Sequence, residues 1–374
     1  MQTKYRIGVI GHTGRGNYGH GIDRVWLELP QCEIVGVADA DEAGLKAAID
    51  RLKAPKGFAD YRKMLDELKP DIAAVGPRWI DQHRDMVVAA AERGIHVYME
   101  KPFCRTPEEA DQIVAACEKN NVKLAIAHQT RWSPKLQTIR DLLLEGAIGD
   151  ILEMRGRGKE DRRGGGEDLW VLGSHIMNLI HHFGGEPNWC FANVLEDGKP
   201  VTKEHVAPGN EGIGLLAGDK INAMYGLSGD VTAYFGTHRH AGGFGAQTTK
   251  PGLRFGLQIF GTQGIIEVHT GHLPPVHILQ DTQWSPGRSG KRWIPVSSAG
   301  IGKEEPLHDG GLHGGNLLAC KDLIAAIEED RLPECNVYEA RTTVEMIAAV
   351  FESHRLGGPV TFPLKNRKNP LKSL

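Results

Sequence analysis

The 374-residue sequence lacks several features that mark whole classes of protein. Its six cysteines form no C-x-x-C pair, which argues against a zinc ribbon, a redox dithiol and a secreted disulfide framework. No apolar run reaches the ~18 residues of a membrane-spanning helix, and the first residues hold no apolar stretch of signal-peptide length. The formal net charge of −3 provides no basic field for nucleic acid or a membrane surface. We therefore expect a cytoplasmic protein that binds a small molecule, with no nucleic-acid partner and no membrane partner.

In the first third of the sequence, short apolar segments of strand length alternate with segments of helical periodicity. Between residues 5 and 129, short apolar segments alternate with segments such as 41–52 and 80–94, whose apolar residues recur at helical spacing. This alternation is typical of a doubly wound parallel sheet. We therefore predict an α/β Rossmann domain over residues 1–127. The predicted strands are 5–11, 33–39, 57–60, 71–76, 95–100 and 123–129.

The pattern changes after Gln129 to a strand-rich region with glycine-marked turns, one of which places Thr262 and Gln263 in a hairpin. The other predicted elements are a helix over 133–149, two amphipathic helices near 314–329 and 337–356, and a last strand at 359–364. We predict an α+β domain over residues 128–374 with a large open, mostly antiparallel sheet. We expect its C-terminal helices to pack on the first domain.

Five glycines occur in the segment VIGHTGRGNYGHG, residues 9–21, directly after the first predicted strand. A dinucleotide site combines a strand, a tight glycine turn, a helix N-terminus that faces the pyrophosphate, and an acid about 20 residues further on. The strict G-x-G-x-x-G motif begins at Gly14, but Gly11 forms the junction with the strand. We therefore predict an enlarged turn followed by a helix, and which glycines touch the phosphates stays open. The alternative is a flexible surface loop.

Asp39, at the end of the second predicted strand, is the acid of this site. No arginine stands at 40 or 41, so the charge of Asp39 would repel a 2'-phosphate, which favours NAD over NADP. The predicted cofactor-binding residues of these two segments are Gly11, His12, Thr13, Gly14, Gly16 and Asp39.

A series of short motifs occurs in the order found in a known family. They are Pro77 and His83 in GPRWIDQH, Glu100-Lys101-Pro102, HQTRWSP at 128–134, GAIGDI at 146–151, GTQG at 261–264 and the closing GGPVTFPL. By this combination the sequence resembles, over nearly its whole length, the Gfo/Idh/MocA oxidoreductases, which include glucose-fructose oxidoreductase and inositol dehydrogenase. The resemblance implies a carbohydrate or polyol substrate and a homodimer or homotetramer paired through the second-domain sheet.

The resemblance also implies roles at the end of the fifth predicted strand. Lys101 would hydrogen-bond the reacting hydroxyl, while Glu100 and the turn at Gly76-Pro77 would border the nicotinamide half of the cofactor. A buried ammonium beside an alcohol stabilises developing alkoxide character, and a neighbouring carboxylate makes its burial tolerable. Alternatively, Lys101 is only an ion-pair partner at the strand end. The cofactor-binding residues added here are Gly76, Pro77, His83, Glu100, Lys101 and Gln129.

The segment DLWVLGSHIMNLIHHFGG, residues 168–185, predicts a helix that lines a cleft. Its apolar stripe is Ile176, Leu179, Ile180 and Phe183, and its polar face carries His175, Asn178 and His182. The family has a D-x-x-x-H pair here, so the resemblance makes His175 the proton acceptor for a sugar alcohol, a role that suits an imidazole. Val171 stands where the aspartate is expected, and Asn178 where a second aspartate is common.

The carboxylate that would activate His175 is therefore missing from its expected position. Asp168 would lie about 10 Å away along a helix axis, too far for direct contact. Glu160 or Asp161, in the charged loop 156–168, are candidates to replace it, although we interpret most of this loop as solvated and self-paired. A lone helical histidine is also often only a structural residue.

Four residues are predicted to contact substrate: Arg131, Trp132, Asn178 and His313. An indole can stack on a sugar ring, and buried donors suit hydroxyl-rich ligands. No metal site is predicted, because the spacings among the histidines match no zinc pattern.

Three functional hypotheses follow from these patterns. The first is an NAD-dependent dehydrogenase that oxidises a secondary hydroxyl of a sugar, inositol or glycoside, with Lys101 and His175 as catalytic residues. The second is an NAD-dependent glycoside hydrolase or lyase that acts through transient oxidation and elimination. The third is a non-catalytic, sugar-sensing regulator of the same fold.

Overall fold

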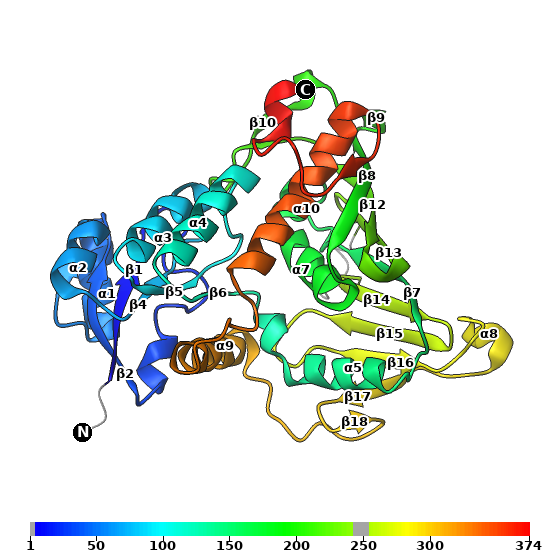
Figure 1. The fold of residues 1–374 in the computed structure, drawn as a ribbon, viewed down its shortest axis with the longest axis horizontal. Helices are drawn as coiled ribbons and strands as arrows, with labels where there is room; N and C mark the ends of the chain where they lie inside the picture. The colour runs from blue at the N-terminus through cyan, green and yellow to red at the C-terminus, as the bar shows by residue number, and fades with distance from the viewer. Residues whose placement is uncertain (1–3, 242–253) are drawn as a thin grey trace. The chain divides into compact units, whose positions relative to one another are not determined.

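The computed structural model describes residues 4–241 and 254–374 (Figure 1). The chain divides into two compact units, each built from several stretches of sequence. The first unit comprises Met1–Gln129, Asn210–Gly214 and Leu312–Val344, and the second comprises Thr130–Gly209, Leu215–Gly311 and Glu345–Leu374. A segment near the end of the sequence therefore belongs to the first unit.

The first unit is built on the six-stranded parallel sheet that the alternating pattern predicts, with strands in the order β3-β2-β1-β4-β5-β6. This is the strand order of a dinucleotide-binding sheet. The strands are β1 (Tyr5–Ile10), β2 (Cys32–Ala38), β3 (Gly57–Phe58), β4 (Ile72–Val75), β5 (His96–Met99) and β6 (Leu124–Ile126). The helices of this unit are α1 (Glu42–Leu52), α2 (Tyr61–Leu68), α3 (His83–Ala91), α4 (Pro107–Lys119) and α9 (Gly311–Glu328).

Local sequence signals fix where these helices begin. Asp41, Asp60 and Thr106 each accept a backbone N–H at the N-terminus of α1, α2 and α4. Pro107 occupies the first turn of α4, where its missing N–H has no intrahelical partner to lose. Because the strands are parallel, the turns that lead into these helices lie at one edge of the sheet, where ligands of such sheets bind.

The helix predicted after the glycine turn is not formed, and this expectation is wrong. Residues 12–24 make successive turns, followed only by a short 3-10 helix, Val25–Glu28. The cause is backbone conformation: five residues of the loop have positive φ, which an α-helix does not allow. They are Gly14, Gly16, Asn17, Gly19 and Gly21.

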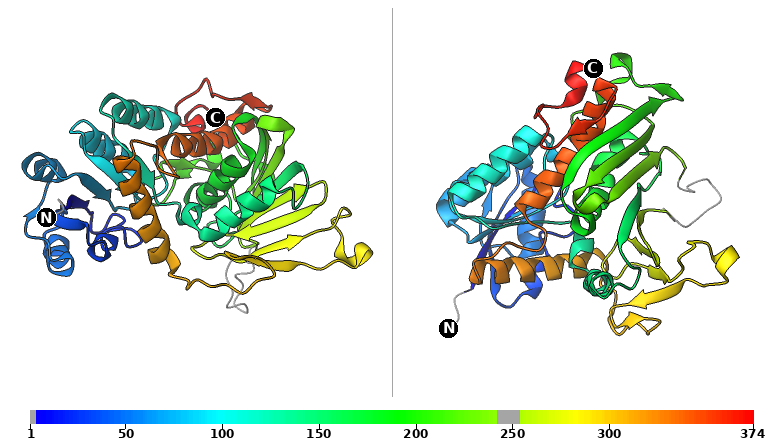
Figure 2. Two further views of the ribbon diagram at one scale, coloured as in Figure 1. Left: turned by 60° about the horizontal axis from the view of Figure 1, so that its bottom comes forward. Right: turned by 45° about the vertical axis from the view of Figure 1, so that its right-hand side comes forward.

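The second unit contains an eleven-stranded sheet, of which Figure 2 gives two views. Neighbouring strands are antiparallel except for the parallel pair β7 (Ile151–Arg157) and β13 (Thr232–His238), which confirms the predicted mostly antiparallel sheet. The predicted hairpin is also confirmed, since Gly261 pairs with Gly264 across a two-residue turn. The other strands on the main path are β8 (Pro187–Glu196), β12 (Lys220–Leu227), β14 (Gly256–Gly261), β15 (Gly264–His269), β16 (Val276–Leu279), β17 (Ile294–Ser297), β18 (Gly300–Ile301) and β19 (Val360–Thr361), and β9 (Lys199–Pro200) pairs with β8.

Helix α7 (Gly173–Gly184) covers one face of this sheet. Its Ile176 and Ile180 pack on Gly156 of β7, where a Cβ would lie 2.5 Å from Ile176. The single helix predicted over 168–185 is interrupted at Leu172, so Asp168 belongs to a separate short helix, α6 (Gly166–Val171). Helices α5 (Pro134–Leu144) and α10 (Val337–Leu356) agree with the helices predicted there.

All six cysteines are buried free thiols, in agreement with the absence of a disulfide framework. Within residues 4–241 and 254–374, none of the helices has both the length and the apolar composition needed to cross a bilayer. In the same residues, no three histidine, cysteine, aspartate or glutamate side chains are grouped so that they could hold a metal ion.

Candidate functional site

The glycine loop, defined here as residues 11–21, begins at Gly11, where only a glycine fits. The Gly11 N–H donates to the Ala38 carbonyl at 2.9 Å, which holds the loop entrance against the end of β2. The ring of Tyr18 fills the space beside Gly11, so a Cβ at Gly11 would lie 2.1 Å from that ring. Gly16 meets the backbone in the same way, because its Cβ would lie 2.3 Å from the Arg78 nitrogen.

The first half of the loop is hydrogen-bonded to itself. His12 and Asn17 exchange backbone hydrogen bonds of 3.0 and 2.9 Å, and Arg15 donates its N–H to the His12 carbonyl. The Gly14 N–H donates to the Asn17 side-chain oxygen at 3.0 Å. A phosphate that used these four N–H groups would therefore have to replace hydrogen bonds of the loop.

Asp39 follows β2 and accepts hydrogen bonds from four protein donors. They are the Thr13 N–H at 3.1 Å, the Thr13 hydroxyl at 2.7 Å, the Tyr18 hydroxyl at 2.8 Å and the Asp41 N–H at 3.0 Å. A carboxylate has about four lone-pair sites, so these donors largely fill its capacity. Ribose hydroxyls would share the oxygens with Thr13 and Tyr18.

Tyr18 is fixed in this position by its surroundings. Burial, and then its hydrogen bond to Asp39, raise the pKa of Tyr18, so the hydroxyl is a neutral donor. The Arg51 guanidinium lies 4.7 Å from the centre of the Tyr18 ring and pairs with Asp23 at 2.7 Å. Tyr18 is therefore the side chain that connects the glycine loop to the acid of β2.

A cavity of about 210 Å³ opens beside Asp39 at the carboxyl ends of β1 and β2. Its lining includes Gly11 and His12 from the loop, and Tyr61 and Arg62 from the start of α2. The guanidinium of Arg62 lies 4.5 Å from the centre of the Tyr61 ring. A hydroxyl-accepting carboxylate, a planar cationic stack and a glycine junction suit the adenosine end of a dinucleotide, so the residues present fit NAD.

Glu100 follows β5 and is completely buried. Its Oε1 accepts the His20 backbone N–H at 2.8 Å and lies 2.5 Å from His20 Nδ1, and its Oε2 accepts the Lys101 N–H at 2.9 Å. Burial alone would raise the pKa of Glu100, but the hydrogen bonds and charge of His20, together with the charge of Lys101, lower it below its usual value. Glu100 is therefore an ionised, buried carboxylate that pairs with the His20 imidazole and feels the opposite charge of Lys101.

The other predicted cofactor residues near Glu100 are held tightly. His83 is buried, with Nε2 2.7 Å from the Pro77 carbonyl oxygen and Nδ1 2.9 Å from the Pro102 carbonyl oxygen, so it connects the turns after β4 and β5. Gly76 lies in a crowded turn, since a Cβ there would lie 3.1 Å from the Ile10 oxygen and 3.2 Å from the Tyr18 backbone. Whether these residues touch the cofactor stays a prediction.

In the second unit, the structure brings two of the predicted substrate residues together. Arg131 Nη1 donates to the side-chain oxygen of Asn178 at 3.1 Å, and both residues are buried, as is the neighbouring Trp132. The same cluster includes His182, whose pKa is lowered to about 2 by burial first and then by the charges of Arg131 and Arg140. The cluster therefore carries the charge of its arginines next to a neutral imidazole.

His175 lies on α7, and its ring makes an edge contact with Phe255 at 6.4 Å between centres. The three acids considered as its activating partner are committed elsewhere. Asp168 accepts the Thr237 hydroxyl at 2.5 Å, and burial raises its pKa. Glu160 pairs with Arg157 and Arg254, and Asp161 pairs with Arg163, so the charged loop is largely self-paired, as expected. The expectation that it is solvated is wrong for three of its acids, because Glu160, Asp161 and Asp168 are buried.

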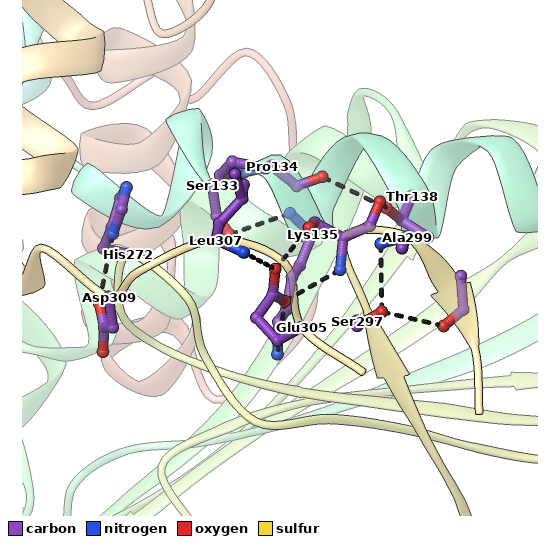
Figure 3. Close-up of polar contacts among 12 residues, drawn as sticks. Ser133, Pro134, Lys135, Thr138, His272, Ser297, Ala299, Glu305, Leu307 and Asp309 are labelled. Atoms are coloured by element: carbon purple, nitrogen blue, oxygen red, sulfur yellow. Dashed lines mark hydrogen bonds and ion pairs between the residues drawn. The ribbon is translucent and has the colours of Figure 1, made fainter. Parts of the chain in front are cut away.

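A separate polar network supports the start of α5 (Figure 3). Lys135 lies 3.5 Å from Glu305, whose carboxylate also accepts the backbone N–H groups of Ser298 and Leu307. The loop around His272 contributes the Gly271 N–H, which donates to the Thr130 hydroxyl at 2.9 Å. These contacts fix the turn that carries Arg131 and Trp132.

His313, a predicted substrate residue, lies in the first unit, with Nε2 2.8 Å from the Glu28 carboxylate. Its predicted contact with substrate remains untested. Sequence reasoning missed three residues that the structure connects to the predicted site: Tyr18, His20 and Asn316. Asn316 had a detectable signal, since it is a polar residue four positions before Cys320 on the buried face of α9.

Two family models match the chain. The first is described as the NAD-binding Rossmann fold of the Gfo/Idh/MocA oxidoreductase family and matches residues 5–128. The second is described as the C-terminal α/β domain of that family and matches residues 140–362. Together they cover most of the sequence.

Curated relatives match over a shorter length. The chain is 33% identical over 139 residues to D-apiose dehydrogenase of Paraburkholderia graminis, covering 36% of each protein. It is 33% identical over 126 residues to scyllo-inositol 2-dehydrogenase (NADP(+)) of Bacillus subtilis, covering 30% of this chain and 35% of the relative. The alignments thus span about a third of the length of these relatives.

The fold is similar to that of levoglucosan dehydrogenase in complex with NADH and levoglucosan, with a TM-score of 0.74 at 19% identity. That alignment covers 96% of this chain and 100% of the other. With both of its domains matched, the chain belongs to the Gfo/Idh/MocA oxidoreductase family, and its first domain is that family's NAD-binding Rossmann domain.

Proposed function

We propose that this protein is an NAD-dependent dehydrogenase that oxidises a secondary hydroxyl of a sugar, an inositol or a glycoside. The observation that carries the proposal is the pair Glu100-Lys101 at the carboxyl end of β5, with an ionised, buried carboxylate beside the lysine. Asp39 supplies a second carboxylate after β2 in the same NAD-binding domain. When bound, the nicotinamide supplies the hydride acceptor.

The protein's own groups would bind the alcohol and manage its proton. Lys101, only 6% exposed, would donate a hydrogen bond to the reacting oxygen and stabilise negative charge as it develops. Burial of its ammonium is tolerated because the preceding residue, Glu100, carries the opposite charge. His175 would accept the hydroxyl proton. Because Val171 replaces the expected aspartate, the group that activates His175 has to be identified by experiment.

Asp39 supports NAD over NADP. The carboxylate follows β2, the next residue is Ala40, and Asp60 adds a second acid to the cavity lining. A 2'-phosphate placed there would meet both carboxylates, whereas Arg62 is the cation that would favour it. The ratio of the dissociation constants for NADP and NAD tests this preference, and a ratio near one contradicts it.

The buried cluster of Arg131, Trp132 and Asn178 supports a carbohydrate substrate. It combines a fixed guanidinium, an amide and an indole, which are the groups that hold hydroxyls and stack on sugar rings. The relatives named as D-apiose and scyllo-inositol dehydrogenases are consistent with such a substrate. The proposal gives the second domain the role of binding the substrate.

The second-domain sheet also supports a homodimer or homotetramer. Phe191 and Tyr234 are 44% and 39% exposed, and both lie beside Met224 in register, so they share one face of the sheet. Large apolar side chains gathered on an open face favour its burial against another subunit. Light scattering after chromatography tests this, with a monomer as the contradicting result.

The main experiment is a screen of NAD reduction against polyols, hexoses, uronates and glycosides. Net accumulation of NADH with a free sugar supports the dehydrogenase. Release of an aglycone without net NADH would instead indicate hydrolysis or elimination through transient oxidation, which the valine at position 171 leaves open. Binding of NAD without turnover of any compound would indicate a sugar-sensing regulator.

A further inference from the structure

His20, the residue that follows Gly19 in the glycine loop, contacts Glu100 with both its backbone and its side chain. Its N–H donates to Oε1 at 2.8 Å, and its Nδ1 lies 2.5 Å from the same oxygen. Gly19 lets the loop pass this close, because a Cβ at Gly19 would lie 2.5 Å from Glu100 Cγ and 2.5 Å from the Gly76 oxygen. The loop therefore lies directly against the Glu100 carboxylate.

His20 is itself held by a buried amide from the end of the sequence. Asn316 of α9, which is completely buried, donates through Nδ2 to the His20 carbonyl at 3.0 Å. Its oxygen accepts the Tyr98 hydroxyl at 2.7 Å and the Gln129 side-chain N–H at 3.3 Å. The nitrogen of this amide thus holds the glycine loop, and its oxygen holds Tyr98 and Gln129. His20 is therefore positioned by α9 as well as by its own loop.

The Glu100 carboxylate accepts hydrogen bonds from the glycine loop and from the peptide that follows Glu100. Its N–H donors include the His20 backbone, the His20 imidazole and the Lys101 backbone. An ionised group that is completely buried is costly unless it is hydrogen-bonded, so removing one donor leaves an oxygen poorly satisfied. The position of the Lys101 peptide would then relax together with that of Glu100.

We propose that His20 is a positioning residue for the nicotinamide end of the cofactor site, acting through Glu100 and the Lys101 peptide. Tyr18, two residues earlier, acts on Asp39 at the adenosine end. One loop therefore fixes two carboxylates, Asp39 through the side chain of Tyr18 and Glu100 through the side chain of His20. This proposal rests on the proposed function only where it predicts an effect on turnover. Its effect on cofactor binding can be measured whether or not the protein is a dehydrogenase.

The test compares NADH with ADP-ribose, which lacks the nicotinamide. We expect His20→Ala to weaken NADH binding about tenfold, as expected for the loss of a hydrogen bond to a charged group, while ADP-ribose binding changes less than about twofold. Tyr18→Phe should weaken both ligands equally. His96→Ala is the matched control, because His96 accepts the Lys123 N–H at the opposite end of β5 and should change neither ligand.

A pair of amide variants separates positioning from a role of the imidazole itself. His20→Asn places an amide N–H near the position of Nδ1 and should restore most of the NADH affinity, whereas His20→Gln extends past it and should not. This pair also serves if His20→Ala does not fold. The proposal is overturned if NADH and ADP-ribose weaken equally, if neither changes, or if His20→Asn binds as poorly as His20→Gln.

Turnover gives an independent outcome. With an active substrate, His20→Ala should lower kcat more than it raises the KM for the alcohol, and His20→Asn should recover kcat. If the unmodified protein binds NADH but oxidises no compound in the panel, the dehydrogenase proposal fails while the binding comparison still decides the role of His20.

Discussion

Replacing Gly11 by alanine tests how the glycine loop is built. An added Cβ would lie 2.1 and 2.2 Å from two atoms of the Tyr18 ring, whereas carbon atoms normally approach to about 3.5 Å. The ring would have to move by about 1.4 Å, enough to break the 2.8 Å hydrogen bond from the Tyr18 hydroxyl to Asp39. The glycine requirement at this position is steric, because its φ lies outside the left-handed region.

The expected cost combines two effects. Forcing extra volume into a packed site costs about 1–3 kcal/mol, and losing a hydrogen bond to an ionised carboxylate costs about 1.5–3 kcal/mol. We therefore expect Gly11→Ala to lower the free energy of unfolding by about 3 kcal/mol and to weaken NAD binding. In a Tyr18→Ala background the clash disappears, so the same substitution should be almost neutral.

Urea denaturation of the four proteins of this double-mutant cycle measures the coupling between the two residues. Gly14→Ala is the control for adding a methyl group to the same loop, because its Cβ would meet nothing within 4 Å. A coupling near zero, with Gly11→Ala equally destabilising in both backgrounds, would refute the contact between Tyr18 and Gly11 as the cause.

Three further predictions concern other parts of the site. Gly16→Ala should cost at least about 3 kcal/mol, because it combines a positive φ with a Cβ 2.3 Å from the Arg78 nitrogen, whereas Gly14→Ala should cost only about 1 kcal/mol; thermal unfolding of the two variants compares them. Asn178→Ala removes an acceptor from a buried guanidinium and should lower the stability by about 1.5–3 kcal/mol, and an unchanged denaturation curve would contradict this. Because the folded pKa of Glu100 is lowered, its ionised form stabilises the fold above the ordinary value of 4.5, and this contribution is lost as the pH falls through the folded pKa. The stability difference between the unmodified protein and Glu100→Gln should therefore shrink as the pH falls below about 4.5, and a constant difference would contradict the shift.

The regular part of the fold could be predicted from the sequence because periodicity records burial. Short apolar runs predicted the parallel strands β1 to β6, and the hairpin at Thr262-Gln263 followed from its flanking glycines. The same reasoning failed after Gly11. The motif predicted a helix, but its glycines and Asn17 adopt left-handed conformations that only the contacts of the folded loop specify.

Residues of the candidate site could be predicted where an acidic residue directly follows a parallel strand, because ligands bind at the carboxyl ends of such strands. Asp39 and Glu100 follow strands whose carboxyl ends meet at one edge, so both were expected there. Tyr18, His20 and Asn316 were missed because their partners are distant in sequence: Asn316 is 296 residues from His20. The local pattern of α9 can mark Asn316 as a polar residue on a buried face, but it does not record which distant residues Asn316 contacts.

The most direct test of the central claim is the rate of NAD reduction by the panel of polyols, hexoses, uronates and glycosides, measured for the unmodified protein and for Lys101→Ala. We expect at least one compound to be oxidised with net formation of NADH, and the variant to lose at least about a hundredfold in kcat while still binding NAD. Equal rates in the two proteins would contradict the assignment of Lys101, and NAD binding without reduction across the whole panel would contradict the dehydrogenase itself.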